Sequence, residues 1–141
     1  MNGEPSKLGS FWRVALAVTA TVGFGLLITA RVLTPNPHGV GTHRQLGFPP
    51  CGVLLRYGRP CPACGMTTSW SLLTRGRVIE SVKSNPAGAY LGVMVFVLSA
   101  WSLLPIFTGR WYYPPSEWFL LGAAIVFLLL AMVVWIFRFF F

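Results

Sequence analysis

Acidic residues are nearly absent from this chain of 141 residues. It contains no aspartate, and its only glutamates are Glu4, Glu80 and Glu117. This scarcity disfavours chemistry by paired carboxylates and a calcium or magnesium site built from carboxylate oxygens. Charged residues make up only 10% of the chain and hydrophobic residues 55%, whereas soluble domains carry about 25% charged residues. Because so few charges cannot cover that much apolar surface in water, the composition predicts a membrane protein.

Three long segments of the chain lack charged residues. The first of these runs has 17 residues and the third has 20, and 20 residues of helix are about 30 Å long, which matches the hydrocarbon core of a bilayer. We therefore expect transmembrane helices over residues 11–31, 86–107 and 118–138. Asn85 is the expected N-cap of the second helix, with Pro86 in its first position. None of the three runs has an ionisable residue in its middle, which disfavours a proton pump or an ion-coupled transporter.

These helices divide the chain into two loops and a tail. Residues 1–10 form the expected N-terminal tail, residues 32–85 a long loop, and residues 108–117 a short one. The whole chain, residues 1–141, is therefore predicted to be a single all-α membrane domain. We expect the first helix to be retained rather than cleaved as a signal peptide, because Arg31 follows it where a small-x-small site would be required.

The basic residues are unevenly distributed. Seven of the eleven lie in residues 31–85, and the net charge is +8. They flank the apolar runs, which is typical of membrane anchors rather than of a nucleic-acid surface. The excess of positive charge predicts that residues 31–85 and the C-terminus are cytoplasmic and that the N-terminus is outside. The expected partner is the lipid bilayer, and the small-residue pair Gly88 and Gly92 suggests a homo-oligomer or a larger membrane complex; no nucleic-acid partner is expected.

All the thiols and imidazoles of the chain lie in the long loop. They follow one another in the order His38, His43, Cys51, Cys61 and Cys64. The last two belong to the string Cys-Pro-Ala-Cys-Gly, which ends at Gly65. Two thiolates at this spacing can bind one metal ion, and glycine lets the backbone turn back towards the sulfurs.

A zinc ion needs four ligands, so two more residues are required. Cys51 is the expected third ligand and His43 the expected fourth, with His38 less favoured, which gives a Cys3His set typical of structural zinc. Two alternatives stay open. Cys61 and Cys64 form a redox dithiol if Cys61 lies at a helix start, where the helix dipole stabilises a thiolate. Alternatively, all three thiols are small apolar groups packed in a turn, without a ligand.

Two short helices are expected within the loop, near residues 65–75 and 77–84. In the first, Met66, Trp70 and Leu73 form one apolar stripe. The second is expected to be amphipathic and to lie in the membrane interface. Three hydroxyl residues at the start of the first helix are expected to bond helix-start N–H groups or to surround a metal: Thr67, Thr68 and Ser69.

The cysteine string also resembles a known family. Residues 61–68, the Arg75-Gly76 pair, Asn85-Pro86 before an apolar helix, and residues 43–52 are similar to small bacterial membrane proteins of domain of unknown function 2752. The resemblance covers roughly residues 43–86. It implies an integral protein of the bacterial inner (cytoplasmic) membrane with several spans, but it supplies no activity.

The sequence therefore predicts a small membrane protein with a cysteine-ligated structural zinc site, formed by Cys51, Cys61, Cys64 and His43. Its expected role is that of an accessory or interaction subunit in the membrane, and the sequence leaves open whether it has an enzymatic activity. The alternatives are a membrane thiol-disulfide oxidoreductase that uses Cys61 and Cys64, and a purely structural subunit of a larger membrane complex.

Overall fold

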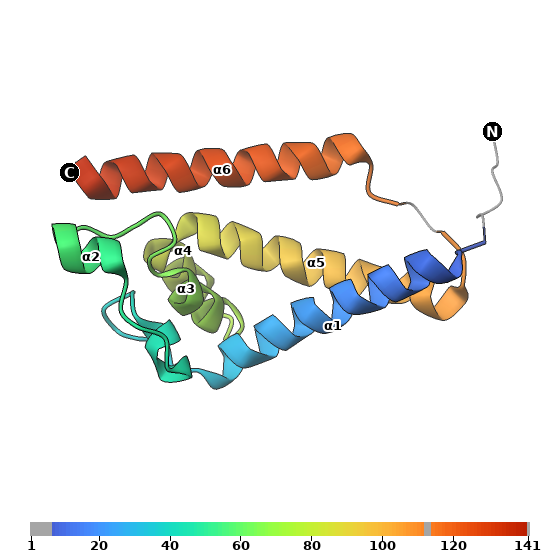
Figure 1. Ribbon diagram of the computed structural model, residues 1–141, viewed down its shortest axis with the longest axis horizontal. Helices are drawn as coiled ribbons and strands as arrows, with labels where there is room; N and C mark the ends of the chain where they lie inside the picture. Colours follow the sequence, from blue (N-terminus) through green and yellow to red (C-terminus); the bar gives the residue numbers. More distant parts are fainter. Residues whose placement is uncertain (1–6, 112–113, 141) are drawn as a thin grey trace.

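The computed structural model describes residues 7–111 and 114–140, and every regular element in these ranges is helical (Figure 1). Residues 1–6 of the expected tail and residues 112–113 of the expected short loop lie outside the described ranges. The helices are α1 (Ser10–Val32), the 3-10 helix η1 (Thr42–Leu46), α2 (Gly52–Tyr57), α3 (Met66–Leu73), α4 (Val78–Ser84), α5 (Pro86–Thr108) and α6 (Glu117–Phe140). The predicted all-α class is confirmed for this part of the chain.

Helices α1, α5 and α6 are the three candidate membrane spans. They contain 23, 23 and 24 residues and are apolar enough to cross a bilayer, so the prediction of three candidate spans is confirmed. Helix α5 lies between the other two and packs against both (Figure 1). Its start is the one predicted, because the side chain of Asn85 accepts a hydrogen bond of 2.8 Å from the backbone N–H of Gly88, and Pro86 follows the cap.

Helix α6 is attached to the rest of the protein by few contacts. It has no buried residue, and it packs on α5 alone among the described helices. The hydroxyl of Tyr90 on α5 donates a hydrogen bond of 3.2 Å to the carbonyl of Ala123. Most of the α6 surface is therefore left for lipid.

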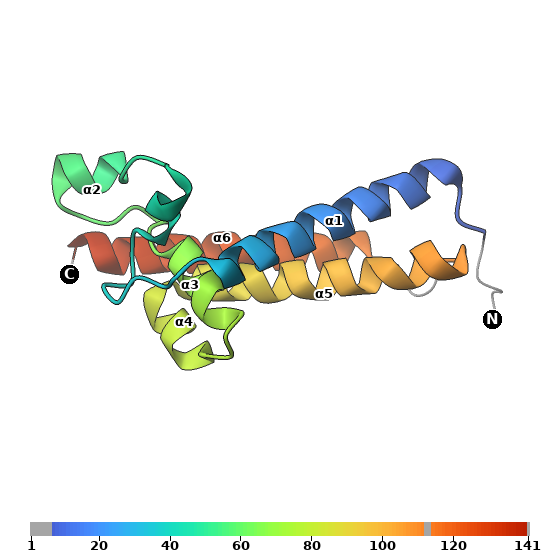
Figure 2. The ribbon, with the colours of Figure 1, turned by 90° about the horizontal axis from the view of Figure 1, so that it is seen from below.

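The short elements gather at one end of the long helices, where α1 ends, α5 begins and α6 ends (Figure 2). Helix α3 packs against α1, α4 and α5. The hydroxyl of Ser71 donates to the carbonyl of Leu33 at 2.6 Å, and the indole N–H of Trp70 donates to the carbonyl of Gly88 at 2.8 Å. These two bonds fix α3 between the end of α1 and the start of α5.

The most deeply buried side chains of the described residues are mostly small and polar. The largest fully buried side chains among them are Thr42, Thr68, Ser69, Ser71, Ser81, Asn85, Ser99, Ser102 and Pro105. The predicted apolar stripe of α3 is therefore not its most buried face, because its hydroxyl face packs inward. In hydrocarbon, apolar side chains gain nothing by moving inside, whereas polar groups must find partners within the protein. The same inversion occurs in α4, where Ile79 and Val82 are exposed and Ser81 is buried.

Glycines allow the helices to approach closely. A Cβ atom added to Gly23 of α1 would lie 1.9 Å from the Oγ of Ser99 on α5, and one added to Gly92 would lie 2.8 Å from the side chain of Leu73. Gly88 likewise faces Met66 and Ser69 of α3. The Gly88 and Gly92 pair therefore serves helix contacts within the chain.

Candidate metal centre

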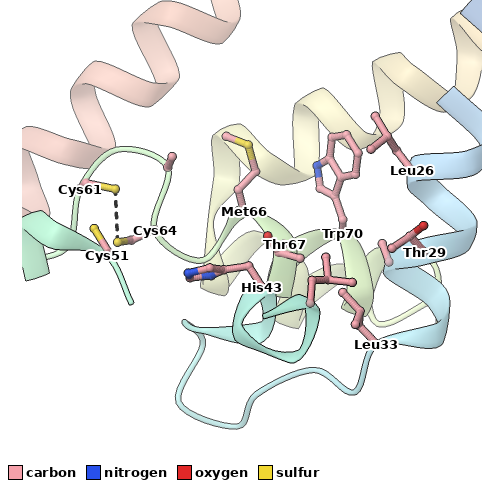
Figure 3. Close-up of a pocket in the computed structure, with 13 residues that line it drawn as sticks. Leu26, Thr29, Leu33, His43, Cys51, Cys61, Cys64, Met66, Thr67 and Trp70 are labelled. Atoms are coloured by element: carbon pink, nitrogen blue, oxygen red, sulfur yellow. Dashed lines mark hydrogen bonds between the residues drawn. The ribbon is translucent and has the colours of Figure 1, made fainter. Parts of the chain in front are cut away.

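The three cysteines converge at the end of the bundle that carries the short helices. Their Sγ atoms all lie within 4.8 Å of one another, and the Sγ atoms of Cys61 and Cys64 are 3.3 Å apart (Figure 3). All three thiols are free. Cys51 comes from the residue that precedes α2, and the other two come from the turn before α3. The loop thus brings together thiols from two separate segments, as the sequence predicted.

A tight turn presents Cys61 and Cys64 on the same side. The backbone N–H of Cys64 donates to the carbonyl of Cys61 at 3.0 Å, and the N–H of Met66 donates to Ala63 at 3.1 Å. Gly65 follows with φ of 89° and is the N-cap of α3, which begins at Met66. That left-handed conformation strongly favours glycine. A Cβ at Gly65 would also lie 2.7 Å from the carbonyl oxygen of Gly39, so space excludes a side chain there as well.

Asn85 holds this turn against the membrane helices. Its side-chain Nδ2 donates to the carbonyls of Pro62 at 3.0 Å and Cys64 at 3.1 Å, while its Oδ1 caps α5. The residue is fully buried. The sequence identified Asn85 only as a helix cap, because its other partners lie more than 20 residues earlier in the chain.

Two further side chains fasten the cysteine turn. The hydroxyl of Ser84 hydrogen-bonds the carbonyls of Gly39 at 2.8 Å and Gly65 at 3.1 Å. The guanidinium of Arg138, near the end of α6, donates to the carbonyl of Cys64 at 3.2 Å. The turn is therefore connected to α4, α5 and α6, although the cysteines themselves precede all of these helices.

The surroundings of the thiols shift their pKa values in opposite directions. The pKa of Cys51 falls to about 7, chiefly because the backbone N–H of Leu54 at the start of α2 stabilises its thiolate. Burial raises the pKa of Cys64 to about 12, and hydrogen bonding with Cys61 adds to that shift. The redox interpretation placed the helix-start thiol at Cys61, which is wrong, because α3 begins only at Met66 and the thiol next to a first helical turn is Cys51.

His43 lies near the cysteines but outside their group. The three sulfurs and His43 line one cavity of about 420 Å³, and the imidazole ring points towards the cysteine side of that cavity (Figure 3). Its Nε2 is 3.2 Å from the carbonyl oxygen of Pro49. The ligand atoms that lie within 4.8 Å of one another are those of the cysteines and do not include His43. His38 lines a different cavity, together with Arg138 and Lys83.

The hydroxyls at the start of α3 have partners other than those predicted. Thr68 and Thr42 share a hydrogen bond of 2.8 Å, and Ser69 bonds both the hydroxyl of Ser81 and the carbonyl of Asn85. These groups connect the loop and helices to one another, so their predicted bonds to helix-start N–H groups are wrong. Thr67 lines the cavity that contains the cysteines.

The sulfur positions fit a tetrahedral ion. A zinc–sulfur bond is about 2.3 Å, so two thiolates on one tetrahedral zinc are separated by about 3.8 Å. The observed limit of 4.8 Å for the three sulfurs and the shorter Cys61–Cys64 distance of 3.3 Å bracket this value. The three sulfurs are therefore close enough together to bind one metal ion, and they line the same cavity as His43.

The fold and the cysteine group together define a small helical protein with three candidate membrane spans and a cluster of thiols suited to a metal ion. Residues 51–99 match a family described as a protein of unknown function (DUF2752), so the resemblance predicted from the sequence is confirmed. The matched segment contains the three cysteines and Asn85, and it begins after His43. No curated protein and no solved structure matches the chain.

Proposed function

We propose that this protein holds one structural zinc ion in the loop between its first two membrane spans and acts as an accessory or interaction subunit in the membrane. The observation that carries the proposal is the convergence of Cys51, Cys61 and Cys64 to within 4.8 Å from two segments of the chain. Three thiolates with one imidazole form a common structural set for zinc.

The fourth ligand in this proposal is His43. Its ring lines the same cavity as the cysteines and makes a single hydrogen bond, to Pro49. Rotation of its side chain would let the ring approach a bound ion, while η1 itself stays fixed by the buried Thr42, which bonds Thr68, and by Gln45, which bonds Thr34. Bound zinc would then join η1 to the cysteine turn.

A structural rather than catalytic role follows from the surroundings of the site. The cavity beside the thiols is lined largely by apolar side chains, among them Leu26, Leu33 and Leu46. Zinc held by four protein ligands has no open position for a reacting water. Bound zinc would supply folding free energy to an irregular loop that is otherwise held by side-chain hydrogen bonds from Asn85, Ser84 and Arg138.

The membrane placement in this proposal is the bacterial inner membrane, with the cysteine loop and the C-terminus in the cytoplasm. Seven basic residues in residues 31–85 support this orientation. Cytoplasmic cysteines are kept reduced, which suits metal ligation better than a permanent disulfide.

Cobalt substitution tests the ligand set. We expect Co²⁺ added to the full-length protein in detergent to give the visible bands of a tetrahedral ion and thiolate-to-cobalt charge transfer. His43→Ala is expected to weaken cobalt binding by at least about tenfold, whereas His38→Ala, in the other cavity, is the matched control and should leave binding unchanged. Absence of the charge-transfer band would contradict the proposal, and an unchanged His43→Ala variant would remove His43 from the ligand set.

A second candidate function is thiol-disulfide exchange. The 3.3 Å contact between the sulfurs of Cys61 and Cys64 favours it. In that reaction the two thiols would lose two protons and two electrons to a partner disulfide, which would become two thiols. Isolation of the protein with a reducible Cys61–Cys64 bond and without metal would favour this function over the zinc site.

A further inference from the structure

A second cavity of about 510 Å³ lies between α1 and α5, away from the cysteines. Phe24 and Ile28 line it from α1, and Val93 and Phe96 line it from α5. The rings of Phe24 and Phe96 meet edge to face, with their centroids 6.5 Å apart. None of the residues that line this groove also lines the cavity of the cysteines, so the two cavities are distinct.

The groove exists because α5 has no side chain at Gly92. Because Gly92 has no side chain, Leu73 and Trp70 of α3 can lie directly against α5. A Cβ atom added to Gly92 would be 2.8 Å from the side chain of Leu73 and 3.3 Å from that of Trp70. Helix α3 therefore closes one end of the groove, while Val93 and Ile28 remain exposed along its sides. The groove is thus formed where α3 packs against α1 and α5.

The closed end of the groove is positively charged. Arg31, in the last turn of α1, lines it together with Thr74. Arg75 lies next to it, with its Nη1 3.4 Å from the carbonyl oxygen of Ala30 and also bonded to Ser71.

No acidic side chain of the described residues balances these two guanidinium groups. Of the two glutamates in the described ranges, Glu80 pairs with Arg77, and Glu117 begins α6 at the opposite end of the bundle. A ligand at this end of the groove would therefore meet uncompensated positive charge.

The groove has a charged end and an apolar end, and these are arranged like the headgroup and the acyl chains of a lipid in the membrane. Arg31 is one residue from the end of α1, which places its charge at the membrane interface. Phe24 lies seven residues earlier, or about 10 Å deeper along the helix at 1.5 Å per residue. An occupant must therefore be anionic at the interface and apolar towards the bilayer centre.

We propose that the groove between α1 and α5 binds one anionic phospholipid of the surrounding bilayer, with an acyl chain along Phe24, Ile28 and Phe96 and its phosphate at Arg31. The phospholipid thus acts as a fixed ligand of the bundle, and it fills the space between two spans that α3 holds apart.

Native mass spectrometry of the full-length protein tests this proposal, with dioleoylphosphatidylglycerol as the anionic probe and dioleoylphosphatidylcholine as the zwitterionic one. The wild-type protein is expected to retain one phosphatidylglycerol in preference to phosphatidylcholine. Arg31→Gln should weaken phosphatidylglycerol binding about fivefold, as expected for one basic residue facing an anionic headgroup, and should leave phosphatidylcholine binding unchanged. Val93→Trp should fill the groove and remove the bound lipid.

Matched controls use positions outside the groove. Arg110→Gln removes a cation at the other end of α5, and Val126→Trp adds the same ring on α6, where Val126 is 43% exposed, as is Val93. Both controls are expected to bind phosphatidylglycerol like the wild type. Equal retention of the two lipids by the wild type, or equal losses in Val93→Trp and Val126→Trp, would overturn the proposal. If Val93→Trp does not fold, the test is the phosphatidylglycerol binding of Arg31→Gln compared with that of Arg110→Gln. Equal binding by these two variants would overturn the proposal.

Discussion

The side-chain amide of Asn85 donates a hydrogen bond of 3.1 Å to the backbone carbonyl of Cys64. The same side chain caps α5, so one buried residue joins the start of a membrane-spanning helix to the turn that carries two of the three thiols. The cysteine site is therefore part of the helical bundle rather than an independent loop. Substitution of Asn85 should affect both the cysteine turn and the start of α5.

Replacement of Asn85 by alanine is expected to lower the free energy of unfolding by roughly 2 kcal/mol. Loss of the helix cap costs about 1 kcal/mol, and the buried carbonyl of Pro62, left without a donor, costs about 1 kcal/mol more, whereas the carbonyl of Cys64 keeps the hydrogen bond from Arg138. Thermal unfolding in detergent measures the effect. Asn36→Ala is the matched control, because the Oδ1 of Asn36 bonds the N–H of His38 in an exposed loop, and it should cost less than about 1 kcal/mol. Equal effects of the two variants would show that Asn85 does not hold the turn.

Two glycines with positive φ make a second matched pair. Gly65 (φ 89°) is enclosed by the carbonyl oxygens of Gly39 and Ser84, whereas Gly58 (φ 65°) has open space where a Cβ would lie. Gly58→Ala is expected to cost only the backbone strain of about 1 kcal/mol. Gly65→Ala should cost about 3 kcal/mol, since overpacking adds to the strain. A Gly65→Ala variant as stable as Gly58→Ala would contradict the described turn.

The metal-free thiols are expected to differ in their reaction with iodoacetamide. Because the pKa of Cys51 is about 7 in the folded chain, its alkylation rate should reach half its maximum near pH 7. Cys64, with a pKa of about 12, should stay unreactive through pH 10. Alkylated peptides identified by mass spectrometry at a series of pH values give both rates. Similar rates at pH 8 would show that the two thiols do not have these different environments.

These shifts also predict how the stability of the metal-free protein depends on pH. The depressed pKa of Cys51 means that its contribution is present above its ordinary pKa and is lost as the pH falls through about 7. The raised pKa of Cys64 has the opposite sign, so its contribution is present below its ordinary pKa and is lost as the pH rises through about 12. Thermal unfolding of Cys51→Ser should therefore lack the change near pH 7 that the wild type shows.

The orientation in the membrane is tested with single cysteines in a chain whose native cysteines are serine. Leu55→Cys lies in the loop expected to be cytoplasmic, and Ser116→Cys precedes α6 on the expected outer side. An impermeant maleimide added to intact cells should label Ser116→Cys and leave Leu55→Cys unlabelled until the cells are lysed. The reverse pattern would place the cysteine loop outside, in an oxidising compartment that favours disulfide chemistry.

The spans and the thiol cluster could be predicted from sequence because their signals are local. A run of 20 uncharged residues in 118–137 suffices to predict a membrane helix, and a Cys-x-x-Cys spacing brings two sulfurs together in a single turn. The contact from Arg138 to Cys64 joins residues 74 positions apart, and nothing in the local pattern of α6 indicates it.

The packing of α3 was not predictable from its pattern, for a physical reason. The apolar stripe of Met66, Trp70 and Leu73 would face a protein core in water. In a membrane the surrounding lipid is as apolar as that core, so the hydroxyls of Ser69 and Ser71 turn inward to find partners. The placement of His43 depends on the irregular chain around η1, for which spacing gives no guide.

The central claim, that Cys51, Cys61 and Cys64 hold one structural metal ion, is tested most directly by zinc content and free-thiol count on the same purified, full-length sample. The proposal predicts one zinc per chain and three thiols that resist a thiol reagent until a chelator releases all three together. A zinc-free protein whose Cys61 and Cys64 are joined by a reducible disulfide, or whose thiol reactivity is unchanged by the chelator, would contradict it.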